Sequence, residues 1–235
     1  MFKFDKLVFG DAGWGDEFLV ATFMTLLVSI MSMGLGLCLA IITVWAKLIK
    51  NRIASFIANF YTTVIRGVPE LLVIYLIFFG GNAVVMKVAK IFGYHGYIEL
   101  NALTIATIAI ATISATYSSE VLRAAYLSIS KGQLEAARAI GMNSFSIFFK
   151  IITPQVIRFA LPGIGNVWQI TLKDTSLISV TGLVEIMRQS RISSNVEHSP
   201  LTFLITAALL YLCLTTISGR FFKFLEMNYS KGYSA

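Results

Sequence analysis

The chain has 235 residues, of which 57% are hydrophobic and only 13% are charged, and its mean hydropathy is +0.77. A soluble globular domain carries roughly 25% charged residues, so the composition excludes an ordinary soluble protein and favours a membrane protein. The net charge is +7. Because the cations fall in short segments between apolar runs, they fit loops that face anionic lipid, and nucleic-acid binding is not expected.

Five apolar runs in chain order predict an all-α membrane protein with about five transmembrane helices. Each run approaches or exceeds the roughly 20 residues that a helix needs to cross a bilayer. The runs cover residues 18–45, 57–79, 102–119, 159–183 and 201–217. The two cysteines, Cys38 and Cys213, lie within these runs, where we expect them to pack as small apolar side chains.

The distribution of Lys and Arg predicts the orientation of the chain. Five spans place the two termini on opposite sides of the membrane. One side, with residues 46–56, 120–158 and the tail from 219, holds eleven Lys and Arg residues, and the other holds six. The positive-inside rule makes the first side cytoplasmic. We therefore expect an outer N-terminal segment over 1–17, a membrane domain over 18–218 and a cytoplasmic tail over 219–235.

The second run carries charges that an ordinary span lacks. Arg66 and Glu70 are four residues apart, with Pro69 between them, so a continuous helix would place both on one face. A charge at the centre of a span costs at least about 2.5 kcal/mol. Two interpretations stay open: an internal ion pair at a proline kink, or a translocation path in which Glu70 meets the cargo.

The fourth run is also unusual. Lys173 and Asp174 are neighbours, and neighbours on a helix diverge by about 100°, so they cannot face each other. The helix-weakening residues Pro162, Gly163 and Gly165 precede them, and broken helices at membrane depth usually line a cavity or are buried in protein. These features favour transport over a membrane enzyme, for which the sequence shows no nucleophile or metal constellation.

The most specific segment is the loop at 131–154. Its first part, Lys131–Gly141, is too polar to span and is rich in helix-forming residues, and Gly141 is suited to end a helix. A second amphipathic piece, 144–152, leads to Pro154. We expect two short helices, broken at a glycine, that form a compact knob on the cytoplasmic face for a soluble partner to move.

This loop resembles the EAA motif of permease subunits in binding-protein-dependent ABC importers. The motif reads Glu, Ala, Ala, three residues, Gly, nine residues, then Ile, any residue, Leu and Pro. The matching residues here are Glu135, Ala136, Ala137, Gly141, Ile151 and Pro154, and Thr153 replaces the Leu.

The resemblance extends to nearly the whole chain. Residues 66–69, Arg-Gly-Val-Pro, look like the Arg-Gly-Thr-Pro element of the family, and residues 160–176 are similar to permeases for polar amino acids. Residues 61–69, 162–169 and the ending at 224–230 look like the Q-type subunit of histidine, lysine and arginine systems or of octopine and nopaline systems.

The resemblance implies a type I ABC importer permease fold in the bacterial inner membrane. It also implies a second permease subunit, in the Q-type case a paralogue, together with two ABC ATPase subunits and a periplasmic amino-acid-binding protein. The chain has no Gly-rich loop ending in Gly-Lys-Ser/Thr. We therefore expect a non-catalytic subunit without a cofactor of its own, with ATP bound by the partner ATPases.

The same resemblance assigns roles to particular residues. The contacts that couple the chain to the ATPase would come from Gln133, Glu135, Ala136, Ala137, Arg138, Gly141 and Pro154. For a cationic amino acid in a low-dielectric path, which needs an opposite charge, the first candidate is Glu70, followed by Asp174 and Glu120, with Arg66 beside the path. Two other classes stay open: a secondary transporter that works alone, and a membrane scaffold without an ATPase partner.

Overall fold

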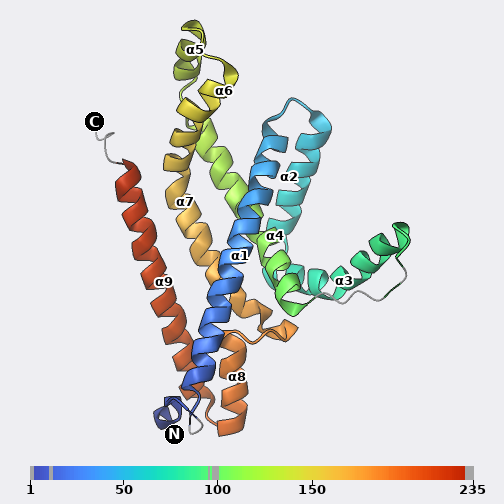
Figure 1. Cartoon of the computed structure of the whole chain (residues 1–235), viewed down its shortest axis with the longest axis vertical. Helices are drawn as coiled ribbons and strands as arrows, with labels where there is room; N and C mark the ends of the chain where they lie inside the picture. The colour runs from blue at the N-terminus through green and yellow to red at the C-terminus, as the bar shows by residue number, and fades with distance from the viewer. Residues whose placement is uncertain (1–2, 11–12, 95, 97–100, 231–235) are drawn as a thin grey trace.

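The computed structural model describes residues 3–10, 13–94, 96 and 101–230, and these ranges are helical with no strand. Figure 1 shows long helices that run side by side, one helix that leaves the bundle sideways and a knob at one end. Four helical stretches within the described residues are long and apolar enough to cross a membrane, and a bent helix pair makes up to five. The predicted all-α membrane architecture is therefore confirmed.

The centre of the bundle is formed by α1 (Gly15–Leu48) and α4 (Ala102–Leu127), which make the most extensive helix–helix contact of the described chain. Small residues allow this close approach. A Cβ atom added at Gly36 of α1 would lie 2.1 Å from Ser114 Oγ and 3.2 Å from the carbonyl oxygen of Ala111 on α4. Across the same contact, Ser32 donates a hydrogen bond to the carbonyl of Thr107, at 3.2 Å.

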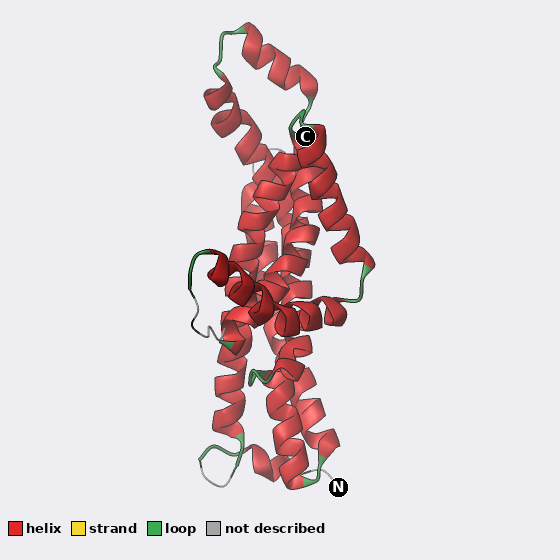
Figure 2. Ribbon diagram, turned by 90° about the vertical axis from the view of Figure 1, so that its right-hand side faces the viewer, coloured by secondary structure: helices red, strands yellow, loops and turns green. Residues whose placement is uncertain are grey.

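The second predicted span is not one helix. It consists of α2 (Arg52–Gly67) and α3 (Glu70–Ile91), and the first part of α3, Glu70–Gly81, is bent away from α2 by 111°. The cause is local: Pro69 disfavours helical geometry at Val68, which is extended at φ −111° and ψ 142°. Figures 1 and 2 show α3 crossing beside the bundle instead of continuing α2.

The predicted knob is present. After α4 come α5 (Lys131–Ala139) and α6 (Ser144–Ile147), then a short π-helical segment, Phe148–Ile152. Between α5 and α6, Gly141 has a φ of +78°, which glycine adopts without the steric cost that a Cβ atom brings. Figure 2 shows the knob standing clear of the bundle.

The fourth span, α7 (Thr153–Asp174), continues through Pro162 without a break. The glycines predicted to weaken it instead permit close packing: a Cβ atom at Gly163 would lie 2.6 Å from Val121 of α4, and one at Gly165 would lie 3.1 Å from Phe222 of α9. The break comes later, because the 3-10 helix Thr175–Thr181 ends at Gly182 with a φ of +98°.

The chain closes with α8 (Ile186–Glu197) and α9 (Pro200–Ser230). The helix α9 extends well beyond the predicted end of the fifth run, so residues 219–230 of the predicted tail are helical, and residues 231–235 lie outside the described residues. At the N-terminal end, hydrogen bonds from Trp14 and Lys3 reach Glu197. Although partial desolvation opposes them, these bonds hold the pKa of Glu197 below its usual range.

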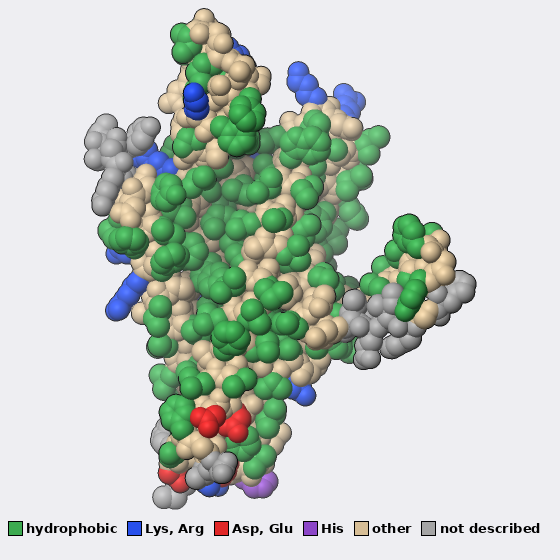
Figure 3. All heavy atoms as spheres, in the orientation of Figure 1, with side chains coloured by type: hydrophobic (Ala, Val, Ile, Leu, Met, Phe, Trp, Pro, Cys, Tyr) green, Lys and Arg blue, Asp and Glu red, His purple; other side chains and the backbone are tan. Residues whose placement is uncertain are grey.

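Most cations lie towards one end of the long axis (Figure 1). The α1–α2 turn, the knob and the end of α9 lie at one end of the molecule, and the starts of α1 and α9 lie at the other (Figure 1). A broad apolar surface covers the middle. Most blue side chains lie towards the first end, and the red and purple ones lie at the second, together with some blue (Figure 3). The three segments expected to hold most cations therefore share one end, although Lys231 lies outside the described residues.

Candidate functional site

The α2–α3 junction places two charges at helix ends. Arg66 lies in the last turn of α2, and Glu70 is the first residue of α3. A cation near a helix C-terminus and an anion near an N-terminus are both favoured by the helix dipole. The sharp bend therefore supplies an electrostatic reason for charges that would be costly inside a continuous span.

Two further side chains converge on this junction. The hydroxyl of Tyr117, on α4, donates a hydrogen bond to Glu70 Oε1 at 3.0 Å. Asp174, at the end of α7 and only 8% exposed, lies within hydrogen-bonding reach of the Glu70 carboxyl. The guanidinium of Arg66 stacks over the Tyr117 ring, 5.4 Å from its centroid. We call Glu70, Asp174 and Tyr117 the acidic site.

The simple ion pair between Arg66 and Glu70 is not found, because the two residues do not share a helix. Among the described residues no salt bridge joins them; Tyr117 connects them instead, through its ring and its hydroxyl. Sequence reasoning missed Tyr117. The sequence offered one signal for it: Tyr117 is an aromatic residue with a hydroxyl group in a run of small residues. A tyrosine hydroxyl usually has a hydrogen-bond partner when it is buried.

The neighbours Lys173 and Asp174 diverge as expected. Lys173 is exposed and Asp174 is buried, so Asp174 alone joins the acidic site. Two carboxyl groups this close repel when both are ionised. The arrangement is therefore suited to a cationic group placed between or beside them.

Glu120 does not join the acidic site. Its Oε1 accepts a hydrogen bond from Lys47 Nζ of α1 at 2.5 Å, and its Oε2 accepts one from Arg123 at 3.1 Å. Lys47 also reaches Thr62 of α2 at 2.7 Å, and its side chain is only 3% exposed. This cluster ties together α1, α2 and α4. Sequence reasoning had assigned Lys47 to a loop, because a cation after an apolar run usually marks the end of a span.

The knob presents two different faces. Ala137 is buried on its inner side, where Gln133 accepts a hydrogen bond from Gln155 of α7 at 2.9 Å. Glu135 and Arg138 are exposed. Pro154 lies in the first turn of α7, directly after the π-helical segment Phe148–Ile152. The residues expected to meet an ATPase thus lie on the knob or, for Pro154, at the start of α7, and some face outward while others hold the knob to α7.

The knob is joined to the acidic site by two rigid helices. It lies between the end of α4, which carries Tyr117, and the start of α7, which carries Asp174. These two helices pack closely, as the approach of Gly163 to Val121 shows. A displacement of the knob would therefore reach two of the three members of the acidic site directly.

Residues 33–231 match the protein family described as binding-protein-dependent transport system inner membrane component. The chain belongs to this family. Permease proteins of other bacteria are similar in sequence to almost the full length of this chain. The nopaline transport system permease protein NocQ of Agrobacterium fabrum is 45% identical over 227 residues, covering 96% of each chain. The histidine/lysine/arginine/ornithine transport system permease protein HisQ of Escherichia coli is 35% identical over 220 residues, covering 94% of this chain and 96% of that protein.

Solved structures show the same permease fold. A chain of an amino acid ABC transporter with histidines matches with a TM-score of 0.78 and 27% identity, covering 92% of this chain and 95% of that one. A chain of the inward-facing MetNI methionine ABC transporter matches with a TM-score of 0.71 and 15% identity, covering 91% and 96%. The predicted type I ABC importer permease fold and the predicted family are confirmed, and the chain is a multi-pass membrane component of a binding-protein-dependent transport system.

Proposed function

We propose that this chain is the permease subunit of an ATP-driven importer in the bacterial inner membrane, and that its cargo is a cationic amino acid or an opine-type derivative. The supporting observation is the acidic site, in which Glu70 and Asp174 approach each other at a break in a membrane-spanning segment. Permease relatives named for nopaline and for histidine, lysine, arginine and ornithine systems point to the same class of cargo.

The chemistry of the acidic site matches a cationic side chain. An ammonium or guanidinium group leaving water needs compensating charge or several oxygen atoms. Glu70 and Asp174 supply carboxyl oxygens, and the Tyr117 hydroxyl fixes Glu70 by a 3.0 Å hydrogen bond. Arg66 is exposed and lies beside the site, where it is placed to attract the carboxylate of the same amino acid.

The driving force would enter through the knob. Two partner ATPases bind ATP, and their closure would displace α5 through contacts at Glu135 and Arg138, with Gly141 setting the angle between α5 and α6. The displacement would pass along α4 and α7 to the acidic site. Exposed apolar side chains on the knob, among them Ile140 at 78% and Phe145 at 72% exposure, support a protein contact on this face.

The complete importer would contain a second permease subunit, a paralogue of this chain, and a periplasmic binding protein that delivers the amino acid. In this assembly the N-terminal segment lies outside and the knob lies in the cytoplasm. The support for this orientation is the excess of Lys and Arg at the knob end.

The cargo role is tested with Glu70→Gln in the complete transporter reconstituted in vesicles. We compare uptake of arginine with uptake of citrulline, which has nearly the same shape without the charge. Removing the carboxylate should lower kcat/KM for arginine about tenfold or more, equivalent to about 1.4 kcal/mol, and change citrulline uptake little. Tyr117→Phe, which removes only the hydrogen bond to Glu70, should cause a smaller loss of the same kind.

The matched control is Tyr75→Phe on α3, since the Tyr75 hydroxyl makes no hydrogen bond that the described part of the chain records. Unchanged arginine transport by Glu70→Gln would remove the cargo role. Uptake that proceeds without ATP or without a co-purifying ATPase would remove the importer assignment itself.

A further inference from the structure

A pocket of about 580 Å³ lies on the inner side of the knob, away from the exposed Glu135 and Arg138. It is bounded by α5, by the segment leading into α7 and by the end of α9, where Tyr229 forms part of the wall. Its lining includes Gln133, Ala136, Ala137, Ile140 and Pro154, which are also expected on the ATPase-contacting element, but none of the roles described above fills the space itself. Its position, lining and charge together indicate a ligand.

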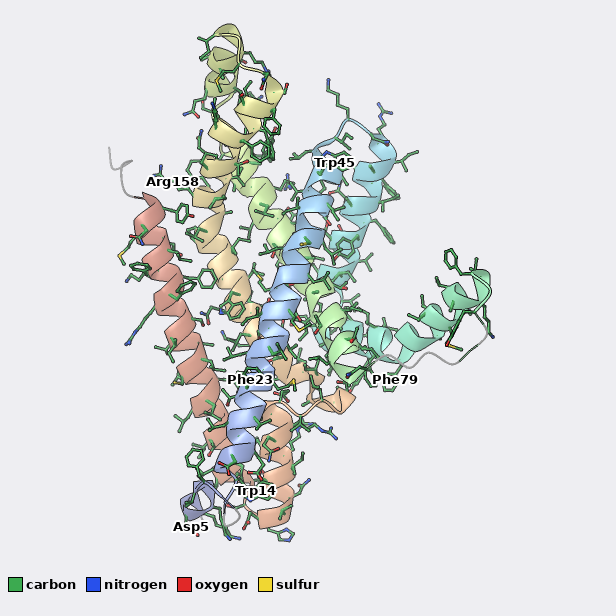
Figure 4. The ribbon with its side chains drawn as sticks, viewed as in Figure 1. Asp5, Trp14, Phe23, Trp45, Phe79 and Arg158 are labelled. Atoms are coloured by element: carbon green, nitrogen blue, oxygen red, sulfur yellow. The ribbon has the colours of Figure 1, made fainter. Side chains whose placement is uncertain are left out.

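The position of the pocket is at the membrane surface. The helix α9, which is long and apolar enough to cross the membrane, includes Tyr229 near its end, and tyrosine is enriched where a span meets the headgroup layer. On α7, Arg158 directly precedes the apolar run at 159–183. On the opposite wall, Pro154 and Arg158 belong to the first turns of α7. Figure 4 shows Arg158 at the knob end of α7, towards the end of α9. A ligand in this pocket would lie at the depth of lipid headgroups.

The lining combines positive charge with apolar surface. Lys150 and Arg158 are the ionisable groups that the described lining contributes apart from Tyr229, and no carboxylate is among them. Most of the rest is apolar, including Met142, Ile151 and Pro154. The amides of Gln133 and Gln155, hydrogen-bonded to each other at 2.9 Å, add polar groups near the cations.

We propose that this pocket binds the headgroup of an anionic phospholipid, with its phosphodiester at Lys150 and Arg158. Basic pockets at the ends of transmembrane helices bind anionic headgroups in this way. The apolar lining favours a lipid over a free phosphate ion, because the glycerol and first acyl carbons gain contact that a small anion does not. The bound lipid would rest against the inner face of α5, so the same helix would contact lipid on one side and the ATPase on the other.

The test uses the full chain, purified in detergent and freed of lipid, with lipid binding measured by native mass spectrometry. Phosphatidylglycerol is compared with phosphatidylcholine of identical acyl chains. Wild type should prefer phosphatidylglycerol, and Lys150→Gln with Arg158→Gln should weaken its binding about tenfold or more. The charge-preserving pair Lys150→Arg with Arg158→Lys should keep most of the preference.

The matched control is Lys50→Gln with Arg52→Gln, which removes two exposed cations from the α1–α2 turn at the same end of the molecule. An equal loss in this control, or equal binding of both lipids by wild type, overturns the proposal. Displacement of the lipid by millimolar inorganic phosphate also overturns it, because the site would then take a soluble anion.

A second measurement on the unaltered chain keeps the test independent of variant folding. Photoactivatable phosphatidylglycerol is cross-linked, and the modified peptide is identified. Modification within residues 133–158 or at Tyr229 supports the pocket, whereas modification confined to other segments rejects it.

Discussion

At the scale of single residues, the charged side chains of the spans are stabilised in different ways. Glu70 and Arg66 use helix ends and a shared tyrosine, whereas Glu120 and Lys47 use a direct ion pair. Hydropathy marks only Arg66 and Glu70 as unusual, because Lys47 and Glu120 fall just outside the predicted runs. The separation of these charges into the acidic site and an inter-helix tie required the contacts between elements.

The ion-pair cluster leads to a prediction about stability. Glu120→Gln should lower the free energy of unfolding by about 2 kcal/mol, because it leaves the buried ammonium of Lys47 without its counter-ion. Breaking a fully buried pair costs about 3–5 kcal/mol. The loss should be smaller here because the Glu120 side chain is 27% exposed. Arg123→Gln removes a partner that is 41% exposed and should cost less than about 1 kcal/mol. Unfolding followed by circular dichroism in detergent measures both, and equal losses would contradict this ranking.

At the scale of elements, the contact between α1 and α4 depends on small residues at defined positions. Gly36→Ala should destabilise the protein by about 1–3 kcal/mol through overpacking, since its Cβ atom would lie 2.1 Å from Ser114 Oγ. Gly34→Ala makes the same chemical change two residues away, where nothing lies within 4 Å, and should be neutral. Melting temperatures of the two variants in one detergent test the difference, and a neutral Gly36→Ala would show that α1 and α4 can separate without cost.

The turn within the knob gives a prediction about coupling. Gly141→Val places a β-branched residue at a φ of +78°, which costs an ordinary L-residue about 1–2 kcal/mol and a β-branched one more. The angle between α5 and α6 should change, and amino acids taken up per ATP hydrolysed should fall several-fold in vesicles.

Gly132→Val is the control for this coupling experiment, because Gly132 lies in α5 and an added Cβ atom meets only Ser130 Oγ at an ordinary 3.7 Å. If the complete transporter with Gly141→Val takes up amino acid and hydrolyses ATP like wild type, the knob does not couple ATP hydrolysis to transport.

At the scale of the whole molecule, the expected orientation is open to direct measurement. In a chain with Cys38→Ser and Cys213→Ser, either Asp5→Cys or Lys131→Cys is introduced; both positions are exposed. A membrane-impermeant maleimide applied to intact spheroplasts should label position 5 and leave position 131 unlabelled until the membrane is permeabilised. The reverse pattern would place the knob outside and exclude an ATPase contact there.

The sequence was sufficient for the long apolar helices and the knob, because apolar runs of fixed length and the glycine at 141 act locally. It did not predict α8 or the extension of α9 as far as residue 230. It was insufficient for the α2–α3 angle, since Pro69 predicts an interruption but not its direction. Gly163 and Gly165 were misinterpreted as helix-weakening for a related reason: whether a glycine interrupts a helix or admits a neighbour depends on that neighbour, here Val121 and Phe222.

Candidate site residues could be predicted from the sequence only where the reason was local. Glu70 and Asp174 were found from the cost of charge in a span. Tyr117 and the Lys47–Glu120 pair were not found, because each depends on a contact between helices. Tyr117 and Glu70 are 47 residues apart in the chain, and Lys47 and Glu120 are 73 apart.

The connection of the knob to α4 and α7 has a mechanical consequence. A push on the knob would move these two helices together, and Tyr117 and Asp174 with them. Glu70 is on α3, which the knob does not join. The acidic site therefore has a seam along one edge, between Glu70 and the other two residues. We expect cargo to be released when this seam opens. Glu70 would then lose contact with the cation while Tyr117 and Asp174 stay together.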